Sequence, residues 1–131
     1  LEYNKLILLM AVLEKKAGYL LQQQDVYVKV SGGVKIDDPA VDLGVVMAVA
    51  SSFKDIAVNM NDCFIGEVGL TGEVRRVSRI EQRINEAKKH GFKRVIVPVG
   101  NMKNADFPEG IEIIPVKDIR ECLDIAFSSV F

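Results

Sequence analysis

The stretch GEVGLTGEVRRVSRIEQR, residues 66–83, contains the clearest structural pattern in the chain. Two short strand-like runs, Phe64–Val68 and Glu73–Val77, flank the four residues Gly69–Gly72. A glycine-rich turn between two strand-like runs predicts a β-hairpin. No Gly-Lys-Ser/Thr follows these glycines, so the pattern favours turn geometry over a phosphate-binding loop.

A helix is expected directly after the hairpin, from about Arg79 to His90. Its apolar residues Ile80, Ile84 and Ala87 recur at helical spacing, and Gly91 is a typical helix stop. An acid and a proline at Asp38-Pro39 predict the start of a central, almost wholly apolar helix. The other expected elements are helices over 3–17, 41–50 and 116–127 and strands over 25–31, 94–98 and 111–115. Interleaved helices and strands in 131 residues indicate a single two-layer α/β (or α+β) domain.

The composition excludes several classes of protein. Apolar residues make up 49% and charged residues 27%, which is typical of a folded domain rather than a disordered chain. The longest apolar stretch, residues 39–51, is too short to span a bilayer and contains Asp42. Cys63 and Cys122 lie among apolar neighbours and are expected to be free thiols of a reducing compartment, which favours the cytoplasm. A single histidine, His90, and no ligand spacing argue against a metal site and against a serine-histidine triad.

One charge feature stands out, although the net charge is only −1. Residues 73–94 contain eight basic and three acidic side chains, a local charge of +5, so the rest of the chain sums to −6. The candidate DNA-binding residues are Arg75, Arg76, Arg79, Arg83, Lys88, Lys89, Lys93 and Arg94. Arginine binds phosphate in a bidentate manner, and helical spacing places Arg79 and Arg83 on one face. Strand alternation, by contrast, places Arg75 and Arg76 on opposite faces. A solvated helix face, or salt bridges to an acidic neighbouring subunit, explains the same residues equally well.

The stretch 66–83, together with Asp38–Asp42 and residues 48–53 (AVASSF), resembles the C-terminal domain of the RadA (Sms) family of bacterial DNA-repair proteins. The resemblance covers essentially the whole chain, residues 1–131. That domain is similar to the proteolytic domain of the Lon protease family. The resemblance therefore implies a two-layer Lon-type fold, ribosomal protein S5 domain 2-like, which assembles as a six-membered ring.

The same resemblance implies that the peptidase chemistry is absent. Lon-type proteases use a serine after a proline at the start of the apolar helix, and the matching position here is Ala40. Their lysine base corresponds to Glu81. An alanine methyl group cannot attack a carbonyl, so the resemblance implies a non-catalytic domain with no cofactor of its own.

What the resemblance implies about function is DNA recombination and repair. The chain is expected to be the C-terminal part of a longer DNA-dependent ATPase whose N-terminal part uses ATP, Mg and Zn. The expected partners are single-stranded or branched DNA and further copies of the chain in a hexameric ring, with no membrane. The alternative is a purely structural oligomerisation module without DNA contact.

Overall fold

The computed structural model describes residues 3–17 and 38–127. The helices are α1 (Tyr3–Ala17), α3 (Asp42–Lys54), α4 (Ile80–Lys89) and α5 (Ile119–Phe127), and the 3₁₀ turns are η1 (Pro39–Val41) and η2 (Val99–Asn101). The strands are β1 (Asp62–Phe64), β2 (Glu67–Val68), β3 (Val74–Arg75), β4 (Arg94–Pro98) and β5 (Glu112–Val116). The strand expected over residues 25–31 lies outside the described residues.

A three-stranded parallel sheet in the order β1-β4-β5 forms the middle of the domain. Its central strand β4 is apolar on both faces, and Val95, Ile96 and Val97 are all fully buried. Val95 and Val97 belong to the apolar cluster under α4, whereas Ile96 belongs to the larger cluster formed with α1, α3 and α5. Because side chains alternate along a strand, the two clusters lie on opposite faces of the sheet. The α/β class is confirmed, and the structure refines the expected layering by placing helices on both faces.

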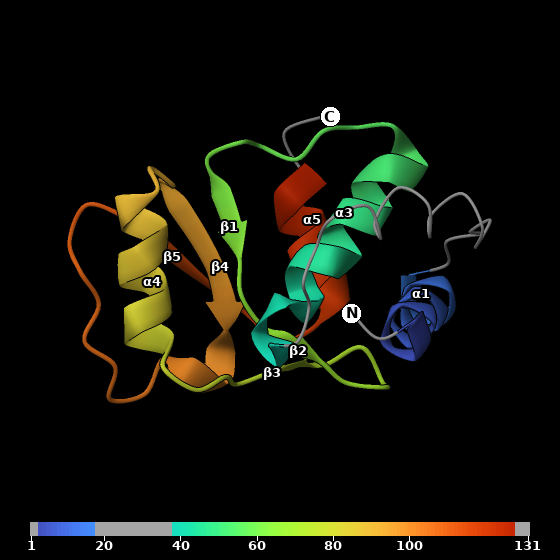
Figure 1. Ribbon diagram of the computed structural model, residues 1–131, viewed down its shortest axis with the longest axis horizontal. Helices are drawn as coiled ribbons and strands as arrows, with labels where there is room; N and C mark the ends of the chain where they lie inside the picture. The colour runs from blue at the N-terminus through green and yellow to red at the C-terminus, as the bar shows by residue number, and fades with distance from the viewer. Residues whose placement is uncertain (1–2, 18–37, 128–131) are drawn as a thin grey trace.

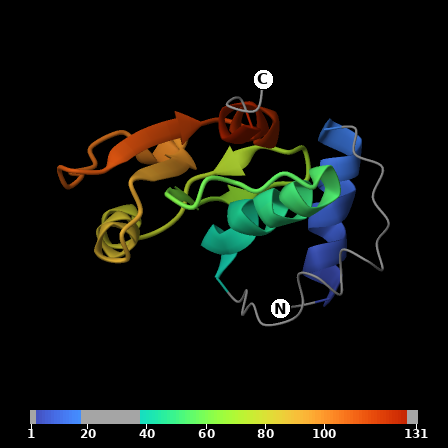
Figure 2. The same ribbon diagram turned by 90° about the horizontal axis from the view of Figure 1, so that it is seen from above.

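Helix α3 is the central helix that the sequence predicts. Leu43, Val46, Met47 and Val49 are at most 1% exposed, and they pack in the cluster shared with α1 and α5. Figures 1 and 2 show α4 at one end of the molecule and α1 at the other, with the sheet, α3 and α5 between them. Among the residues that the structure describes, no helix has the length and apolar character needed to cross a membrane.

The hairpin is confirmed, but its strands are shorter than predicted. The expected strand Phe64–Val68 is divided: β1 pairs with β4, and only β2 pairs with β3. The break lies at Gly66, whose amide donates to Ala40 O (2.8 Å) and whose carbonyl accepts from Leu43 N (3.0 Å). These backbone groups are bound to the start of α3, so they cannot continue a sheet ladder. Gly72 closes the turn with φ +82°, a conformation that favours glycine.

The start of α4 agrees with the prediction to within one residue, whereas α5 begins three residues later than predicted. Arg79 has φ 59°, in the left-handed region, so it precedes α4 rather than forming its first turn. The last helix was expected from Val116, but that residue ends β5, and the Asp118 carboxylate accepts from Glu121 N (2.8 Å) before α5 begins. The predicted buried face of α4, Ile80, Ile84 and Ala87, is confirmed.

Candidate nucleic-acid interface

The eight basic residues of the predicted DNA surface do not form one continuous patch. Arg76 lies against Gly100, just beyond the C-terminal end of β4, whereas Arg94 is the first residue of that strand. Five residues of extended chain separate these ends by about 15 Å. The ten-residue helix α4 likewise has Arg79 before its first turn and Lys88 and Lys89 in its last turn. The basic segment is therefore divided between two regions of the surface, and Arg75, which directly precedes Arg76, lies in strand β3 of the hairpin.

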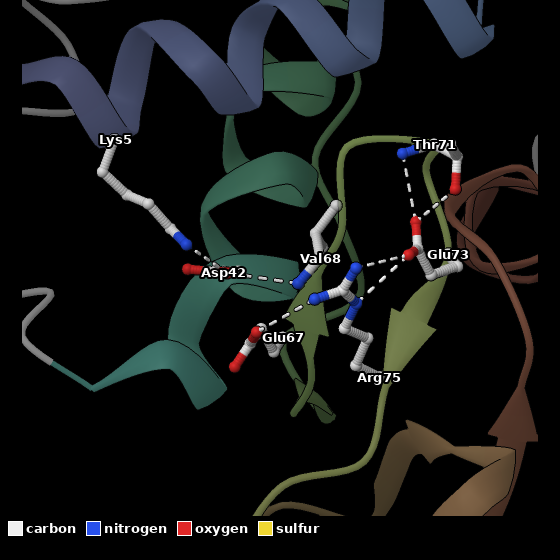
Figure 3. Close-up of polar contacts among 7 residues, drawn as sticks. All are labelled: Lys5, Asp42, Glu67, Val68, Thr71, Glu73 and Arg75. Carbon is white, nitrogen blue, oxygen red and sulfur yellow. Dashed lines mark hydrogen bonds and ion pairs between the residues drawn. The ribbon is translucent and has the colours of Figure 1, made fainter.

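Arg75 is engaged within the hairpin (Figure 3). Its Nε and Nη2 donate to Glu73 Oε2 at 3.1 and 2.8 Å, and its Nη1 lies 3.9 Å from Glu67 Oε1. Glu73 also accepts from the amide (3.1 Å) and hydroxyl (2.5 Å) of Thr71. These contacts, the Thr71 hydroxyl foremost and Arg75 next, lower the pKa of Glu73 to about 2. The guanidinium thus contributes to the order of the hairpin turn.

The guanidinium group of Arg83 also has interaction partners within the chain. Its guanidinium forms an ion pair with Asp38, with Nη2 3.2 Å from Oδ1, and its Nε donates to Ser78 O at 2.7 Å. The hydrogen bond from Arg83 holds the pKa of Asp38 below its usual value. The salt-bridge interpretation assigned Arg83 an acidic partner in a neighbouring subunit, but the structure places an acidic partner in the same chain. Arg79 and Arg83 therefore do not form a matched pair of free cations.

The last four residues of the predicted set lie at the end of α4 and at the start of the central strand β4, namely Lys88, Lys89, Lys93 and Arg94. Arg94 donates through Nε (2.8 Å) and Nη2 (2.7 Å) to Asp62, whose side chain is only 1% exposed. This ion pair and the exposed Lys93 line a pocket together with Asn59, Asn61 and Glu112. In the last turn of α4, Lys88 donates to the carbonyl of Glu109, and Lys89 is exposed.

Arg76 and Arg79 are the two arginines of the predicted set that are exposed and whose side chains have no hydrogen bond or ion pair with any part of the chain that the structure describes. Both lie on the short segment 76–79 between β3 and α4. Asn101, which the sequence analysis did not single out, is 5% exposed and hydrogen bonds to Val77 in the middle of that segment. The sequence offers one indication of its role, because Asn101 is a polar residue that follows Gly100 shortly after the apolar strand 94–98.

The two positions that the resemblance assigned to the Lon dyad lie on segments that meet at the α4 face of the sheet. Ala40, in η1, is 4% exposed and belongs to the apolar cluster under α4. Glu81 is in the first turn of α4, and its Oε2 accepts from Asp106 N at 3.0 Å. The Asp38–Arg83 ion pair joins the same two segments. A methyl group and a hydrogen-bonded carboxylate thus stand at these positions.

The remaining candidate groups are the two cysteines and the histidine. Cys63 and Cys122 are free thiols; burial raises the pKa of both, that of Cys122 to about 12. His90 is exposed at the end of α4, 3.2 Å from Glu86. Within residues 3–17 and 38–127, no three His, Cys, Asp or Glu side chains are grouped so that they could hold a metal ion.

Comparison with known proteins identifies the fold family. Residues 10–129 match the Lon protease (S16) C-terminal proteolytic domain. The chain belongs to this family. Its Lon-type fold is the one that the sequence resemblance implied.

The similar full-length proteins are DNA repair proteins. The chain is 60% identical over 123 residues to DNA repair protein RadA of Bacillus subtilis (strain 168), covering 94% of this chain and 27% of that protein. It is 54% identical over 128 residues to DNA repair protein RadA of Streptococcus pneumoniae, covering 98% of this chain and 30% of that protein. DNA repair protein RadA of Listeria monocytogenes is 54% identical over 123 residues, which cover 94% of this chain and 27% of that protein. The resemblance to RadA is confirmed, and this Lon-type chain spans less than a third of the length of these relatives.

Proposed function

We propose that this chain is a non-proteolytic Lon-type domain of a bacterial DNA recombination and repair ATPase. In this proposal it serves as a ring-assembly scaffold and provides a sequence-independent DNA-binding surface. The observation that supports DNA contact best is the pair of exposed, unpaired arginines, Arg76 and Arg79, on one short segment of the described chain. Free guanidinium groups can bind phosphate without first breaking an internal ion pair.

The proposed surface is narrower than the eight residues of the sequence prediction. Arg75, Arg83 and Arg94 have carboxylate partners, so binding phosphate through them would require the loss of those partners. Lys89 and Lys93 are exposed and can form a second, weaker contact at the other end of α4. Contacts of this kind fix the position of DNA but do not read its sequence. The proposed partner is DNA recognised through its backbone, single-stranded or branched as the resemblance implies.

The absence of peptidase activity is the second part of the proposal. A serine nucleophile needs both an accessible hydroxyl and a base. Ala40 supplies no hydroxyl and is buried under α4, and Glu81 is hydrogen bonded to a backbone amide. Neither the chain as it stands nor Ala40→Ser with Glu81→Lys is expected to hydrolyse an unstructured protein. Hydrolysis by the pure, unmodified chain would contradict this part of the proposal.

A purely structural oligomerisation module is the second candidate. The observation that favours it is that three of the five predicted arginines, Arg75, Arg83 and Arg94, have carboxylate partners within the chain. Under this alternative, the remaining basic side chains contact a neighbouring subunit rather than DNA.

DNA binding measured at several salt concentrations distinguishes the two candidates. Fluorescence anisotropy with labelled single-stranded, duplex and branched oligonucleotides would compare the chain with its Arg76→Ala, Arg79→Ala double variant. For duplex DNA, each lost phosphate contact lowers the slope of log affinity against log salt by about 0.9 and weakens all sequences alike. Lys15→Ala with Lys16→Ala on α1 removes the same charge far from α4 and serves as the control. An unaltered slope with intact affinity would remove Arg76 and Arg79 from the DNA surface.

The wider context of the chain is part of the same proposal. The full-length protein would be a cytoplasmic, DNA-dependent ATPase that uses ATP, Mg and Zn in its N-terminal part and forms a hexameric ring. Residues 1–131 would form the single Lon-type domain of that full-length protein. Free thiols at Cys63 and Cys122 agree with a reducing compartment.

A further inference from the structure

We propose that Asn101 is a positioning residue that holds the segment 76–79 in the conformation in which Arg76 and Arg79 meet the DNA backbone. The inference rests on the proposed DNA contact and deepens it, because it names the residue that organises that surface. Asn101 itself is 5% exposed and is not expected to touch DNA.

The first support is the way in which the Asn101 amide is bound. Its Oδ1 accepts from Val77 N at 2.9 Å, and its Nδ2 donates to Val77 O at 2.9 Å. The side chain thus occupies both backbone groups of one residue, as a neighbouring β-strand would. Strand β3 ends at Arg75, so Val77 receives from a side chain the pairing that the ladder no longer supplies.

The second support is that the rest of the segment is fixed as well. Ser78 O accepts from Arg83 Nε at 2.7 Å, and Arg79 has φ 59° although it is not a glycine. A left-handed conformation at an arginine persists only where surrounding contacts impose it. The clamp at Val77 and the bond at Ser78 are such contacts, and they lie directly before Arg79.

The third support is the contrast between the backbone and the side chains of the segment. The backbone is held at residues 77 and 78, whereas the Arg76 and Arg79 side chains are exposed. Arg76 also lies beside the residue that precedes Asn101, since a Cβ on Gly100 would be 3.5 Å from Arg76 Cβ. A segment that is ordered before binding loses less conformational freedom when it contacts a ligand. The clamp therefore strengthens binding without adding a contact to DNA.

A double-mutant cycle tests the proposal in the 131-residue chain. Asn101→Ala is expected to weaken duplex binding by about fivefold to tenfold. This increase in Kd corresponds to the net free energy of roughly one hydrogen bond, which the segment would no longer gain from its ordered conformation. In the Arg76→Ala, Arg79→Ala background the same change should leave DNA affinity unaltered, while it lowers the unfolding temperature equally in both backgrounds. Asn85→Ala, which removes an exposed amide on α4, is the matched control and should change neither quantity. An equal loss of affinity from Asn101→Ala in both backgrounds would show a merely structural role and overturn the proposal.

Hydrogen exchange on the unmodified chain provides a test that does not depend on the variant folding. The Val77 amide, which donates to Asn101 Oδ1, should be protected from exchange in the unmodified chain. A Val77 amide that exchanges as fast as the exposed loop amides would overturn the proposal. If Val77 is protected but Arg76→Ala with Arg79→Ala leaves binding unchanged, the proposed DNA contact fails instead, so the two failures are distinguishable.

Discussion

Two arginine–carboxylate pairs on neighbouring parts of this chain differ in what surrounds them. Arg94 and Asp62 are register partners on β4 and β1, and the Asp62 side chain is 1% exposed. Arg75 and Glu73 lie in the hairpin with side chains 54% and 38% exposed. A buried carboxylate needs its cation because water does not solvate it, whereas an exposed one is also stabilised by solvent. We therefore expect the loss of each pair to be detected by a different measurement.

Removing the partner of the buried carboxylate should destabilise the fold. Arg94→Met leaves Asp62 charged and without its two hydrogen bonds, and we expect a loss of about 3 kcal/mol in the free energy of unfolding. Urea denaturation measures this loss. Adding Asp62→Leu to Arg94→Met should recover most of the stability, since no buried charge then remains. If Arg94→Met alone costs less than a surface substitution, the pair does not have the structural role assigned to it.

The Arg75–Glu73 ion pair in the hairpin should be detected by the titration of the Glu73 carboxyl group rather than by the free energy of unfolding of the whole domain. The pKa of Glu73 is about 2, so the stabilisation from its charged form is complete above about pH 4.5 and is lost as the pH falls through about 2. Thr71→Val removes the hydroxyl donor that contributes most and should raise this pKa towards 4.5. Arg75→Ala should raise it as well. Carboxyl chemical shifts followed by NMR against pH give both midpoints, and an unmoved Glu73 midpoint in Thr71→Val would refute the assignment.

At the scale of elements, the junction between the hairpin and α3 depends on a glycine with no room for a side chain. A Cβ on Gly66 would lie 2.7 Å from Val74 Cγ1 and 3.5 Å from both Leu43 and Pro98. Gly44 of α3 differs, because its nearest neighbour would be Phe64 O at 3.7 Å, an ordinary contact. The same substitution by alanine can therefore be compared at a glycine without room for a Cβ and at a glycine with room for one.

We expect opposite effects from the same substitution at these two glycines. Gly66→Ala should destabilise the domain by about 1–3 kcal/mol through overpacking. Gly44→Ala should stabilise it by up to about 1 kcal/mol, because alanine favours the helix and no neighbour must move. Chemical denaturation of both variants measures the difference. Similar changes in both, of either sign, would contradict the packing described at Gly66.

The sequence predicted most elements because their signals are local. The apolar spacing of Ile80, Ile84 and Ala87 and the Asp38-Pro39 start are properties of neighbouring residues, and both are confirmed. The break at Gly66 and the end of β3 were not predictable in this way. They depend on Ala40, Leu43 and Asn101, which approach only in the folded chain.

The candidate site was predictable to a similar extent. A basic cluster is visible from composition alone, and so the eight residues could be named. Which of them have carboxylate partners could not be read from the sequence, because Asp38 lies 45 residues from Arg83 and Asp62 lies 32 residues from Arg94. The sequence-based prediction therefore included more unpaired basic side chains than the structure shows.

At the scale of the whole molecule, α4 and α1 stand at opposite ends, with the sheet, α3 and α5 between them (Figure 2). Within the described residues, five large apolar side chains are exposed and are distributed over several parts of the chain, namely Leu8 (43% exposed), Phe53 (44%), Met60 (91%), Leu70 (65%) and Val99 (53%). Scattered apolar residues are usual on a monomer, so they do not by themselves define an interface. The proposed ring is tested by the size of the particle in solution.

The ring proposal predicts self-association of the isolated chain. Sedimentation velocity over a wide concentration range should show species larger than the 14.5 kDa monomer at high concentration. Arg76→Ala with Arg79→Ala should leave this distribution unchanged if these arginines face DNA, and should shift it towards monomer if they face a neighbouring subunit. Monomer alone at every concentration would count against autonomous assembly.

The parallel sheet at the centre also affects how this chain reaches its native state. Residue 62 pairs with residue 94, and residue 94 pairs in turn with residue 112, so none of the three strands can form its ladder from adjacent chain. The entropy of closing these loops must be overcome before burial of Val95 and Val97 stabilises the product. Helices and the β2–β3 hairpin can form early from local contacts, and β4 completes the core late. We therefore expect the pairing of this central strand, rather than the formation of the helices around it, to limit the folding rate.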